Sequence, residues 1–325
     1  MITRRRVVLG AGSFVIAARA AAQSRTYRVG FIGNSNATFS RGPEQALLAG
    51  LGELGYREGK NLVLERRYIE GRQERLPALA TELVNSGVEV AVVGGERPAL
   101  AVRAAKPTLP IVLAWSFDPV RNGLAASLAR PGGNVTGLTW DVSAEQVAKR
   151  LQIFKEVVPS LSRIALIWDP ALAGVADYWP QVNAASKALG IETYSVEVRA
   201  ASDLRPALEG IRRNRPSALF VWDGPALSSQ VETIYDFAAR ERLPAFSAST
   251  FHIDRGCLLA YSVNALDLSR RAAAFVDRIL KGVKPGDIPI EQPTKFELVV
   301  NQKTARRIGV VIPPSILLRA DRVIE

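Results

Sequence analysis

The fold class of this chain is decided by residues 88–97, which read VEVAVVGGER. Residues 88–93 form a short, nearly continuous apolar run, which is typical of a parallel strand buried on both faces. The glycine pair Gly94-Gly95 ends the run, and a helix is predicted from about Pro98 to Ala105. A buried strand that turns through glycine into a helix is the repeating unit of an α/β fold.

The same unit recurs on both sides of this stretch. In the first part of the chain, apolar spacing predicts further strands at 27–32, 61–68, 111–115 and 134–139, with helices at 44–54, 75–85 and near 123–129. A second array follows, with strands at 163–168, 191–198, 218–222 and 244–247 and helices at 175–189, 203–213 and 229–240. Two successive arrays predict two doubly wound α/β lobes with parallel sheets. The alternation alone leaves a single barrel of eight units open as the alternative.

The last part of the chain departs from a simple tandem of two arrays. A strand is predicted at 256–261, a helix at 267–280 and another strand at 295–301, with more helix beyond. These additional elements indicate that the chain returns to the first lobe and then again to the second.

The composition is that of a folded globular protein with little metal or thiol chemistry. The chain has 325 residues, 48% of them hydrophobic and 22% charged, with a single histidine, His252, and a single cysteine, Cys257. One cysteine excludes an intrachain disulfide, and one histidine with one cysteine cannot build a zinc cluster. There is no G-x-S-x-G nucleophile elbow. We therefore predict a protein that is not an enzyme and holds no metal or cofactor, with His252 in a loop or lining a cleft.

Residues 1–22 have the pattern of an export signal. Three arginines at 4–6 resemble a twin-arginine start, residues 7–18 are apolar but too short to span a membrane, and three alanines at 20–22 form a small-residue cleavage pattern. A buried N-terminal helix is the alternative. We expect a mature periplasmic chain that begins near Gln23. No cysteine stands at the cleavage point, so no lipid anchor is expected.

The positive charge of the chain does not indicate a nucleic-acid partner. Four arginines lie within residues 1–22, so removal of this segment lowers the net charge from +11 to +7. The remaining basic residues are scattered among acids, as at residues 65–67 (ERR) and 240–242 (RER). Such mixing is typical of a solvated surface rather than of a basic stripe.

Candidate ligand contacts follow the strands, because open α/β sheets bind ligands beyond the carboxyl ends of their strands. The first strand is followed by a small polar loop that contains Asn34 and Ser35. The run at 88–93 is followed by Gly95, Glu96 and Arg97, where backbone N–H groups at a helix start can bind an anion. A glycine pair also simply ends many strands, so both interpretations stay open.

Three of the five tryptophans close apolar strands, and each is followed within three residues by an aspartate: Trp115 by Asp118, Trp168 by Asp169, and Trp222 by Asp223. Such rings either cover the core beneath loops or line a cleft that grips a planar or apolar ligand or a cation. An aspartate before proline, at residues 118 and 169, usually shapes a turn. Glu96 and Asp223 are therefore the better candidates to hold an ammonium group.

The predicted ligand-binding set combines these strand-end residues with neighbouring polar and aromatic ones. It comprises Asn34, Ser35, Gly95, Glu96, Arg97, Trp115, Ser116, Phe117, Asp118, Trp168, Asp169, Trp222, Asp223, Ser247 and Phe251.

Several longer motifs carry a resemblance to a known family. They read GLGELGY at 50–56, EGKNL at 58–62, DPV at 118–120, LARPGGNVTGL at 128–138 and EQPTKFELVVN at 291–301. With these motifs, the chain resembles the ABC-transporter substrate-binding proteins that include tryptophan- and tyrosine-type binders. The similarity runs through essentially the whole mature chain.

The resemblance implies a periplasmic-binding-protein-like class I fold, in which two lobes joined by a three-strand hinge close on a small solute. It implies crossings near 136–140, 255–259 and 284–288. The N-terminal lobe would then comprise residues 23–138 with about 258–285, and the C-terminal lobe residues 139–257 with about 286–325.

The resemblance also implies a function. The chain would bind an amino acid, aromatic ones included, or a related organic molecule and deliver it, as a monomer, to an ABC permease in the membrane. The alternative is a periplasmic ligand sensor that presents its closed form to a membrane receptor.

Overall fold

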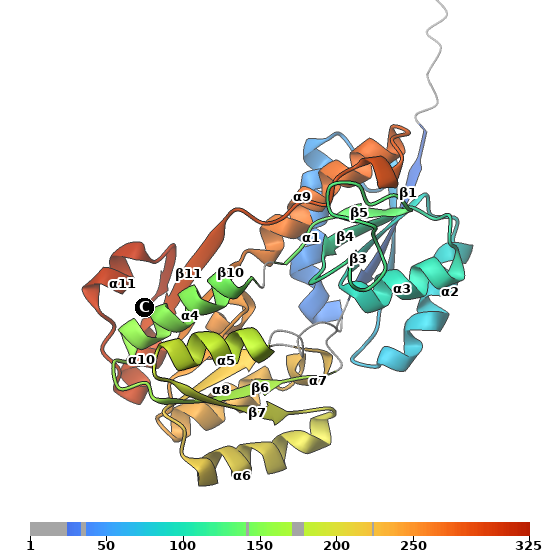
Figure 1. Cartoon of the computed structure of the whole chain (residues 1–325). Coiled ribbons are helices and arrows are strands. Elements are labelled where there is room, and N and C mark those ends of the chain that lie inside the picture. The colour runs from blue at the N-terminus through green and yellow to red at the C-terminus, as the bar shows by residue number, and fades with distance from the viewer. Residues whose placement is uncertain (1–24, 34–36, 141–142, 171–178, 223) are drawn as a thin grey trace, which may run out of the picture.

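The computed structural model describes residues 25–33, 37–140, 143–170, 179–222 and 224–325. The predicted export signal at 1–22 lies outside these residues. Figure 1 shows the described chain as two α/β lobes. None of the described helices is both long enough and apolar enough to cross a membrane.

The smaller lobe is built on a five-stranded, all-parallel sheet in the order β2-β1-β3-β4-β5. Its strands are β1 (Tyr27–Gly33), β2 (Leu62–Tyr68), β3 (Val90–Gly94), β4 (Ile111–Trp115) and β5 (Val135–Gly137). Its helices are α1 (Ala37–Glu53), α2 (Leu76–Asn85), α3 (Glu96–Ala105) and α9 (Ala265–Leu280), with short turns η1 (Gln73–Arg75) and η5 (Pro285–Asp287).

Strand β3 explains why residues 88–93 look apolar throughout. Val90 and Val92 belong to the core beneath α1 and α9, whereas Ala91 and Val93 belong to the core beneath α2 and α3. Successive side chains of a strand point to opposite faces, so a strand covered on both sides needs apolar residues at every position.

The larger lobe is built on a seven-stranded sheet in the order β12-β11-β10-β9-β8-β6-β7. Its strands are β6 (Arg163–Trp168), β7 (Glu192–Glu197), β8 (Ala218–Trp222), β9 (Ala245–Ser247), β10 (Leu259–Val263), β11 (Phe296–Asn301) and β12 (Arg322–Ile324). All neighbours are parallel except β10 and β11, so the predicted parallel sheet contains one antiparallel pair.

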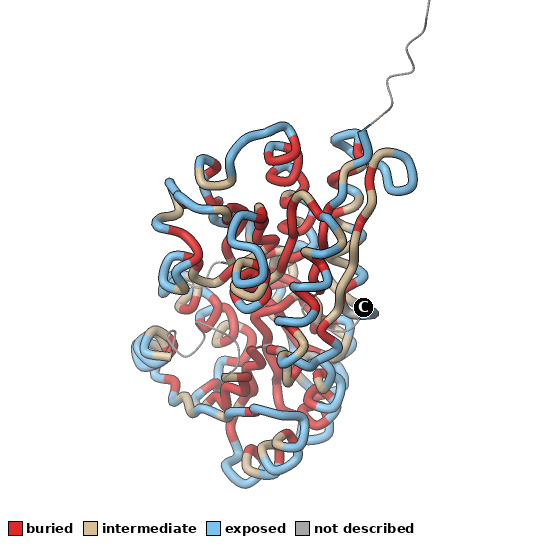
Figure 2. Tube along the Cα trace, turned by 90° about the vertical axis from the view of Figure 1, so that its right-hand side faces the viewer, coloured by how far each residue is buried: buried red, intermediate tan, exposed pale blue. Residues whose placement is uncertain are grey.

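Helices cover both faces of the larger sheet. One face carries α4 (Ala144–Val157), α5 (Trp179–Ala188), α10 (Gln302–Ile308) and α11 (Pro314–Arg319). The other carries α6 (Leu204–Asn214), α7 (Pro225–Ser228) and α8 (Val231–Arg240), preceded or followed by the turns η3 (Ala201–Asp203) and η4 (Thr250–Arg255). Figure 2 shows buried chain running through the middle of the molecule beneath an exposed outer layer.

The chain crosses between the lobes at three places: after β5, between β10 and α9 at Asn264, and between η5 and β11. Two of the crossing segments are hydrogen-bonded to each other, since Thr139 N–H donates to the carbonyl of Glu291 and Glu291 N–H donates to Gly137, each over 2.9 Å. Two separate open sheets rule out the single barrel.

The structure differs from the predicted lobe boundary at about 258. Strand β10 pairs with β9 and β11 in the larger sheet, and only the following helix α9 packs on the smaller lobe. The crossing therefore lies about five residues after the expected 255–259. An apolar run such as 257–261 suits a buried strand of either lobe, so the sequence alone does not decide its partner.

Two predicted helices also differ from the structure. Residues 123–129 form turns instead of a helix, with Leu124 N–H bonded to the carbonyl of Pro119 and Ala126 N–H to that of Pro131. The helix expected at 229–240 begins two residues later, as α8, and the separate short helix α7 precedes it.

Candidate functional site

The boundary between the lobes contains a cluster of three aromatic side chains from the smaller lobe and the first crossing. Trp115 ends β4, Phe117 follows it, and Trp140 lies in the first crossing segment. Their ring centroids are 5.5 Å apart for Trp115–Phe117, 5.9 Å for Trp115–Trp140 and 6.3 Å for Phe117–Trp140. All three rings are half-buried. We call these three residues the aromatic cluster.

The aromatic cluster touches the cores of both lobes. Trp115 packs against the core of the smaller lobe, Phe117 against that of the larger lobe, and Trp140 against both. The cluster is therefore placed where a change in the angle between the lobes alters its surroundings.

The glycine pair after β3 seats the indole of Trp115. A Cβ atom on Gly94 would lie 2.7 Å from Trp115 Nε1, and one on Gly95 would lie 3.0 Å from the ring. Gly95 also has a φ of +87°, which a residue with a side chain rarely adopts. Its N–H donates to the carbonyl of Trp115 over 2.9 Å, so this donor is not left for an anion.

Glu96 holds the loop after β4 together. Its side chain is buried, with the residue only 2% exposed, and its Oε1 accepts from Ser116 Oγ (2.8 Å), Phe117 N (2.5 Å) and Asp118 N (2.9 Å). All three bonds fall on one carboxylate oxygen. The carboxylate therefore fixes the backbone beneath the aromatic cluster, a role different from the predicted grip on an ammonium group.

The neighbouring predicted residues either stabilise the loop after β4 or lie exposed on the surface. Ser116 is fully buried, and its carbonyl accepts from Trp140 N–H over 2.6 Å, which ties β4 to the first crossing. Asp118 Oδ1 accepts from Arg121 N–H over 2.9 Å and shapes a turn, as expected for an aspartate before proline. Arg97 is exposed in the first turn of α3.

In the larger lobe the strand-end tryptophans belong to the core. Trp168 is 7% exposed and donates from Nε1 to Ser195 Oγ over 2.7 Å. Trp222 is 3% exposed and meets Phe220 edge-to-face at 5.8 Å. The sequence left two interpretations of a strand-end tryptophan: a ring that covers the core or a ring that lines a cleft. Trp168 and Trp222 cover the core, whereas Trp115 lies at the boundary between the lobes.

Asp169, next to Trp168, is also buried and serves the larger lobe internally. Its Oδ2 accepts from Ala226 N–H over 2.7 Å at the start of α7. Gly224 lies against it so closely that a Cβ there would be 2.5 Å from Asp169 Cβ. Asp169 thus joins the loop after β6 to the loop after β8.

A buried polar group follows β9. Ser247 Oγ accepts from Ser249 N–H over 3.0 Å and lies 3.0 Å from His252 Nδ1, which is also 2.7 Å from Tyr235 Oη. His252 lies in the turn η4 between β9 and β10, as the loop alternative predicted, but it is fully buried, so the cleft-lining alternative is wrong. Phe251 is half-buried in η4.

Three predicted contacts, Asn34, Ser35 and Asp223, lie outside the described residues. Among the residues that are described, no three of His, Cys, Asp and Glu are grouped so as to hold a metal ion. Cys257 is buried, and its burial raises the pKa of the thiol from 9.0 to about 12, which leaves it unreactive at neutral pH.

Trp140 was missed by the sequence reasoning. Two residues separate it from the end of β5, but it directly follows the predicted strand at 134–139 and precedes Asp141, so it shares the pattern of the other three tryptophans. Its other signal in the sequence was its place within the expected crossing at 136–140.

Comparison with known proteins identifies the class of protein that this fold and boundary cluster define. A family model described as ABC transporter substrate binding protein matches residues 43–324. The chain therefore belongs to that family, whose members bind substrates and are not enzymes.

Individual relatives and solved structures agree with this family. A tyrosine-binding protein from Clostridioides difficile is 20% identical over 267 residues, which cover 82% of this chain and 76% of the relative. A conserved domain protein from Vibrio cholerae superposes with a TM-score of 0.85 at 26% identity, covering 92% of this chain and all of that one. An ABC domain from Streptococcus pneumoniae in complex with L-Trp also gives 0.85, at 22% identity and the same coverage.

Proposed function

We propose that this chain is the solute-binding component of an ABC importer, which closes its two lobes on an amino acid with an aromatic side chain, or a related planar molecule, and delivers it to a membrane permease. The observation that carries this proposal is the aromatic cluster between the two lobe cores. Aromatic rings favour edge-to-face and offset contacts with another ring, and a site between two domains suits a small ligand.

The names of relatives support an aromatic amino acid as the ligand. One similar protein is named for tyrosine, and one similar structure holds L-Trp. In our proposal the ligand ring packs on Trp115, Phe117 and Trp140. Its polar groups meet the strand-end loops that contain Asn34, Ser35 and Asp223.

Closure around the three crossings is part of the same proposal. The crossing segments at 138–140 and 289–292 are bonded to each other, and the third passes through Asn264. Short segments at element ends can absorb the backbone rotation of a hinge while both sheets stay rigid. Trp140, on one of these segments, would sense closure directly.

Cellular placement completes the proposal. The segment 1–22 would direct the chain to the periplasm, and removal of that segment would leave a monomer that begins near Gln23. N-terminal sequencing of periplasmic material tests this, because a chain that keeps Met1 or stays in the cytoplasm would contradict export.

A calorimetric titration of the purified chain tests the ligand class. L-Trp, L-Tyr and L-Phe should bind, whereas L-Leu and L-Asp should bind much more weakly. The bound ligand at one hundred times its Kd should stabilise the chain by about 2.7 kcal/mol in thermal unfolding.

Variants locate the site. Trp140→Ala should weaken binding of the best aromatic ligand about tenfold or more, because it removes one face of the site. Tyr194→Ala is the matched control, since Tyr194 is a half-buried aromatic residue on β7 that lies over Arg163. Equal affinities of both variants and the unaltered chain would refute the aromatic cluster as the site.

A further inference from the structure

A pocket lies in the larger lobe, at the edge of the sheet formed by the amino ends of β8 and β9. It has a volume of about 630 Å³ and is lined by residues from the ends of α6 and α8 and from the loops that lead into β8 and β9. These are the amino ends of the two strands, whereas the candidate ligand site lies beyond the carboxyl ends of the strands. Figure 1 shows α6 on the side of the larger lobe farthest from the smaller lobe.

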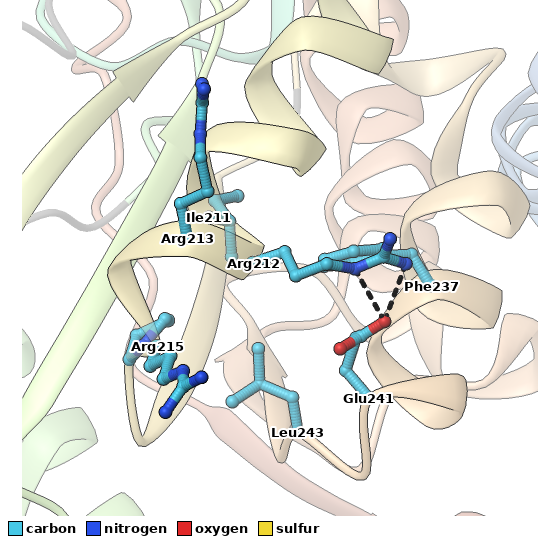
Figure 3. Close-up of a pocket in the computed structure, with 8 residues that line it drawn as sticks. Ile211, Arg212, Arg213, Arg215, Phe237, Glu241 and Leu243 are labelled. Carbon is cyan, nitrogen blue, oxygen red and sulfur yellow. Dashed lines mark hydrogen bonds and ion pairs between the residues drawn. The ribbon is translucent and has the colours of Figure 1, made fainter.

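The lining combines positive charge with an apolar wall. Three arginines, Arg212, Arg213 and Arg215, surround an apolar part formed by Ile211, Pro216, Phe237 and Leu243. The single acid of the lining is Glu241, whose Oε1 accepts from Arg212 Nε (3.0 Å) and Nη2 (2.7 Å). Figure 3 shows this ion pair beside Phe237, while Arg213 and Arg215 extend away from it in other directions.

Arg213 and Arg215 are not needed to complete the end of α6. The carbonyl of Ile211 accepts from Arg215 backbone N–H, that of Gly210 from Asn214 Nδ2, and that of Asn214 from Arg163 Nη1. Basic side chains near a helix end often serve its free carbonyls. Here other groups do so, and both guanidinium groups are exposed and outside every ion pair found among the described residues.

Backbone conformation gives an independent reason to ask why arginine stands here. Five described helices end in a glycine with positive φ: Gly55, Gly87, Gly190, Gly282 and Gly309. The two helices that meet at this pocket use arginine instead, Arg215 after α6 (φ 46°) and Arg242 after α8 (φ 52°). Glycine adopts this conformation without steric cost, and arginine does not. Of these two arginines, Arg215 lines the pocket.

We infer that this pocket binds a phosphate-bearing organic ligand, with the phosphate held by Arg213 and Arg215 and the organic part resting on Pro216, Phe237 and Leu243. Guanidinium groups match the oxygens of a phosphate with paired N–H donors. Their exposed, unrestrained stems allow them to converge on an anion. The phosphate could come from a soluble ester or from the head group of a membrane lipid, and this chemistry is the same for both.

The test uses the full mature chain and two sources of one head group. Soluble sn-glycerol 3-phosphate is titrated by calorimetry, and vesicles of phosphatidylglycerol are compared with vesicles of phosphatidylcholine by co-sedimentation. We expect saturable binding with a Kd of about 1 mM or tighter in one of the two arms. Binding in the soluble arm assigns a free ester as the ligand, and binding only to phosphatidylglycerol vesicles assigns the lipid. Failure to bind in both arms overturns the inference.

Variants separate a site from general charge. The double variant Arg213→Gln/Arg215→Gln should weaken binding about tenfold, since it removes both charged donors. The double variant Arg205→Gln/Arg306→Gln removes the same charge from exposed positions on α6 and α10 and should bind as the unaltered chain does. Equal weakening in both double variants would show non-specific attraction and overturn the site.

Arg215→Gly gives a readout that a purely structural arginine would not produce. Glycine relieves the positive φ, so the melting temperature should rise while phosphate binding weakens about threefold. A higher melting temperature with unchanged binding would refute a role for Arg215. The double variant should leave aromatic amino acid binding unchanged, so this inference and the proposed function can fail separately.

Discussion

Trp115 ends β4 in the smaller lobe and Trp222 ends β8 in the larger lobe, and an aspartate follows each within three residues. The first ring is half-buried at the boundary between the lobes, whereas the second is enclosed in the core. The neighbouring strand accounts for the difference. In the sheet register Trp115 lies beside Gly94, but Trp222 lies beside Trp168.

This difference teaches that the residue beside a strand-end tryptophan on the neighbouring strand decides whether its ring lies in the core or at the boundary between the lobes. Gly94 and Gly95 have no side chains, so the indole of Trp115 lies directly on their backbone. The ring therefore stays at the carboxyl end of the sheet. Two tryptophans in register fill the same volume with side chains, and they become part of a close-packed interior. Four predictions would break or sharpen this contrast.

Trp222→Ala should have the largest effect. Removal of a buried tryptophan side chain costs about 3–5 kcal/mol in the free energy of unfolding. Trp115→Ala should cost about half as much, since its ring is only partly buried. Urea denaturation gives the free energy of unfolding of both variants. Equal losses of stability would contradict the distinction between a core and a boundary tryptophan.

Glu96→Ala should cost about 3 kcal/mol of stability, because it leaves the Ser116 hydroxyl and two backbone N–H groups without their buried acceptor. Glu96→Gln keeps an acceptor oxygen and should cost about 1 kcal/mol. Thermal unfolding measures both variants. Unchanged melting temperatures together with lost binding of an aromatic amino acid would instead restore Glu96 as a ligand contact.

Trp115→Ala and Trp222→Ala should also differ in ligand affinity. Loss of a ring that touches the ligand should weaken binding of an aromatic amino acid about tenfold, or about 1.4 kcal/mol. In Trp222→Ala the affinity of the fraction that remains folded should stay within about threefold of the original. Calorimetry at a temperature where both variants are folded checks this, and the reverse order would place the site in the larger lobe.

Cys257 gives the smallest effect and reports on the larger lobe alone. Its pKa is about 12 in the folded chain and 9.0 ordinarily, so between these values the unfolded thiol loses its proton and the folded thiol keeps it. This contribution to stability is complete below pH 9 and is lost as pH rises toward 12, by at most about 1.4 kcal/mol per pH unit.

The Cys257→Ala variant serves as the reference for that pH dependence. The free energy of unfolding of the unaltered chain should fall more steeply between pH 9 and 10.5 than that of the variant. Parallel slopes would mean that the thiol is accessible in the folded larger lobe.

Much of the fold was predictable, because buried parallel strands carry apolar residues at nearly every position. Strands β4, β6 and β8 were predicted to the residue at both ends, and the return of the chain to each lobe was anticipated. The partner of β10 was not, since pairing depends on residues far away in sequence. The turns at 123–129 have apolar residues at helical spacing, but bonds to Pro119 and Pro131 stabilise another conformation.

The candidate site was less predictable than the fold. Trp115 and Phe117 were identified from their place after a strand. Glu96 was predicted as a ligand contact because it follows the carboxyl end of β3. Only the structure shows that its Oε1 accepts hydrogen bonds from the backbone N–H groups of Phe117 and Asp118. Trp140 was identified only when the first crossing brought it beside β4.

The three crossings also set the order in which the chain can fold during synthesis. Neither lobe is complete until the last fifth of the chain has emerged, because the smaller lobe needs α9 and the larger sheet needs β10 to β12. The bond from Tyr56 Oη to Asp277 joins residues 221 positions apart, and the one from Thr136 Oγ1 to the carbonyl of Ile288 spans 152. Contacts of such separation form slowly, since a long loop must close first. A growing chain therefore keeps the part of its first sheet that α9 covers open until residues 265–280 have emerged, more than a hundred residues after β5, and a chaperone has that interval in which to hold it.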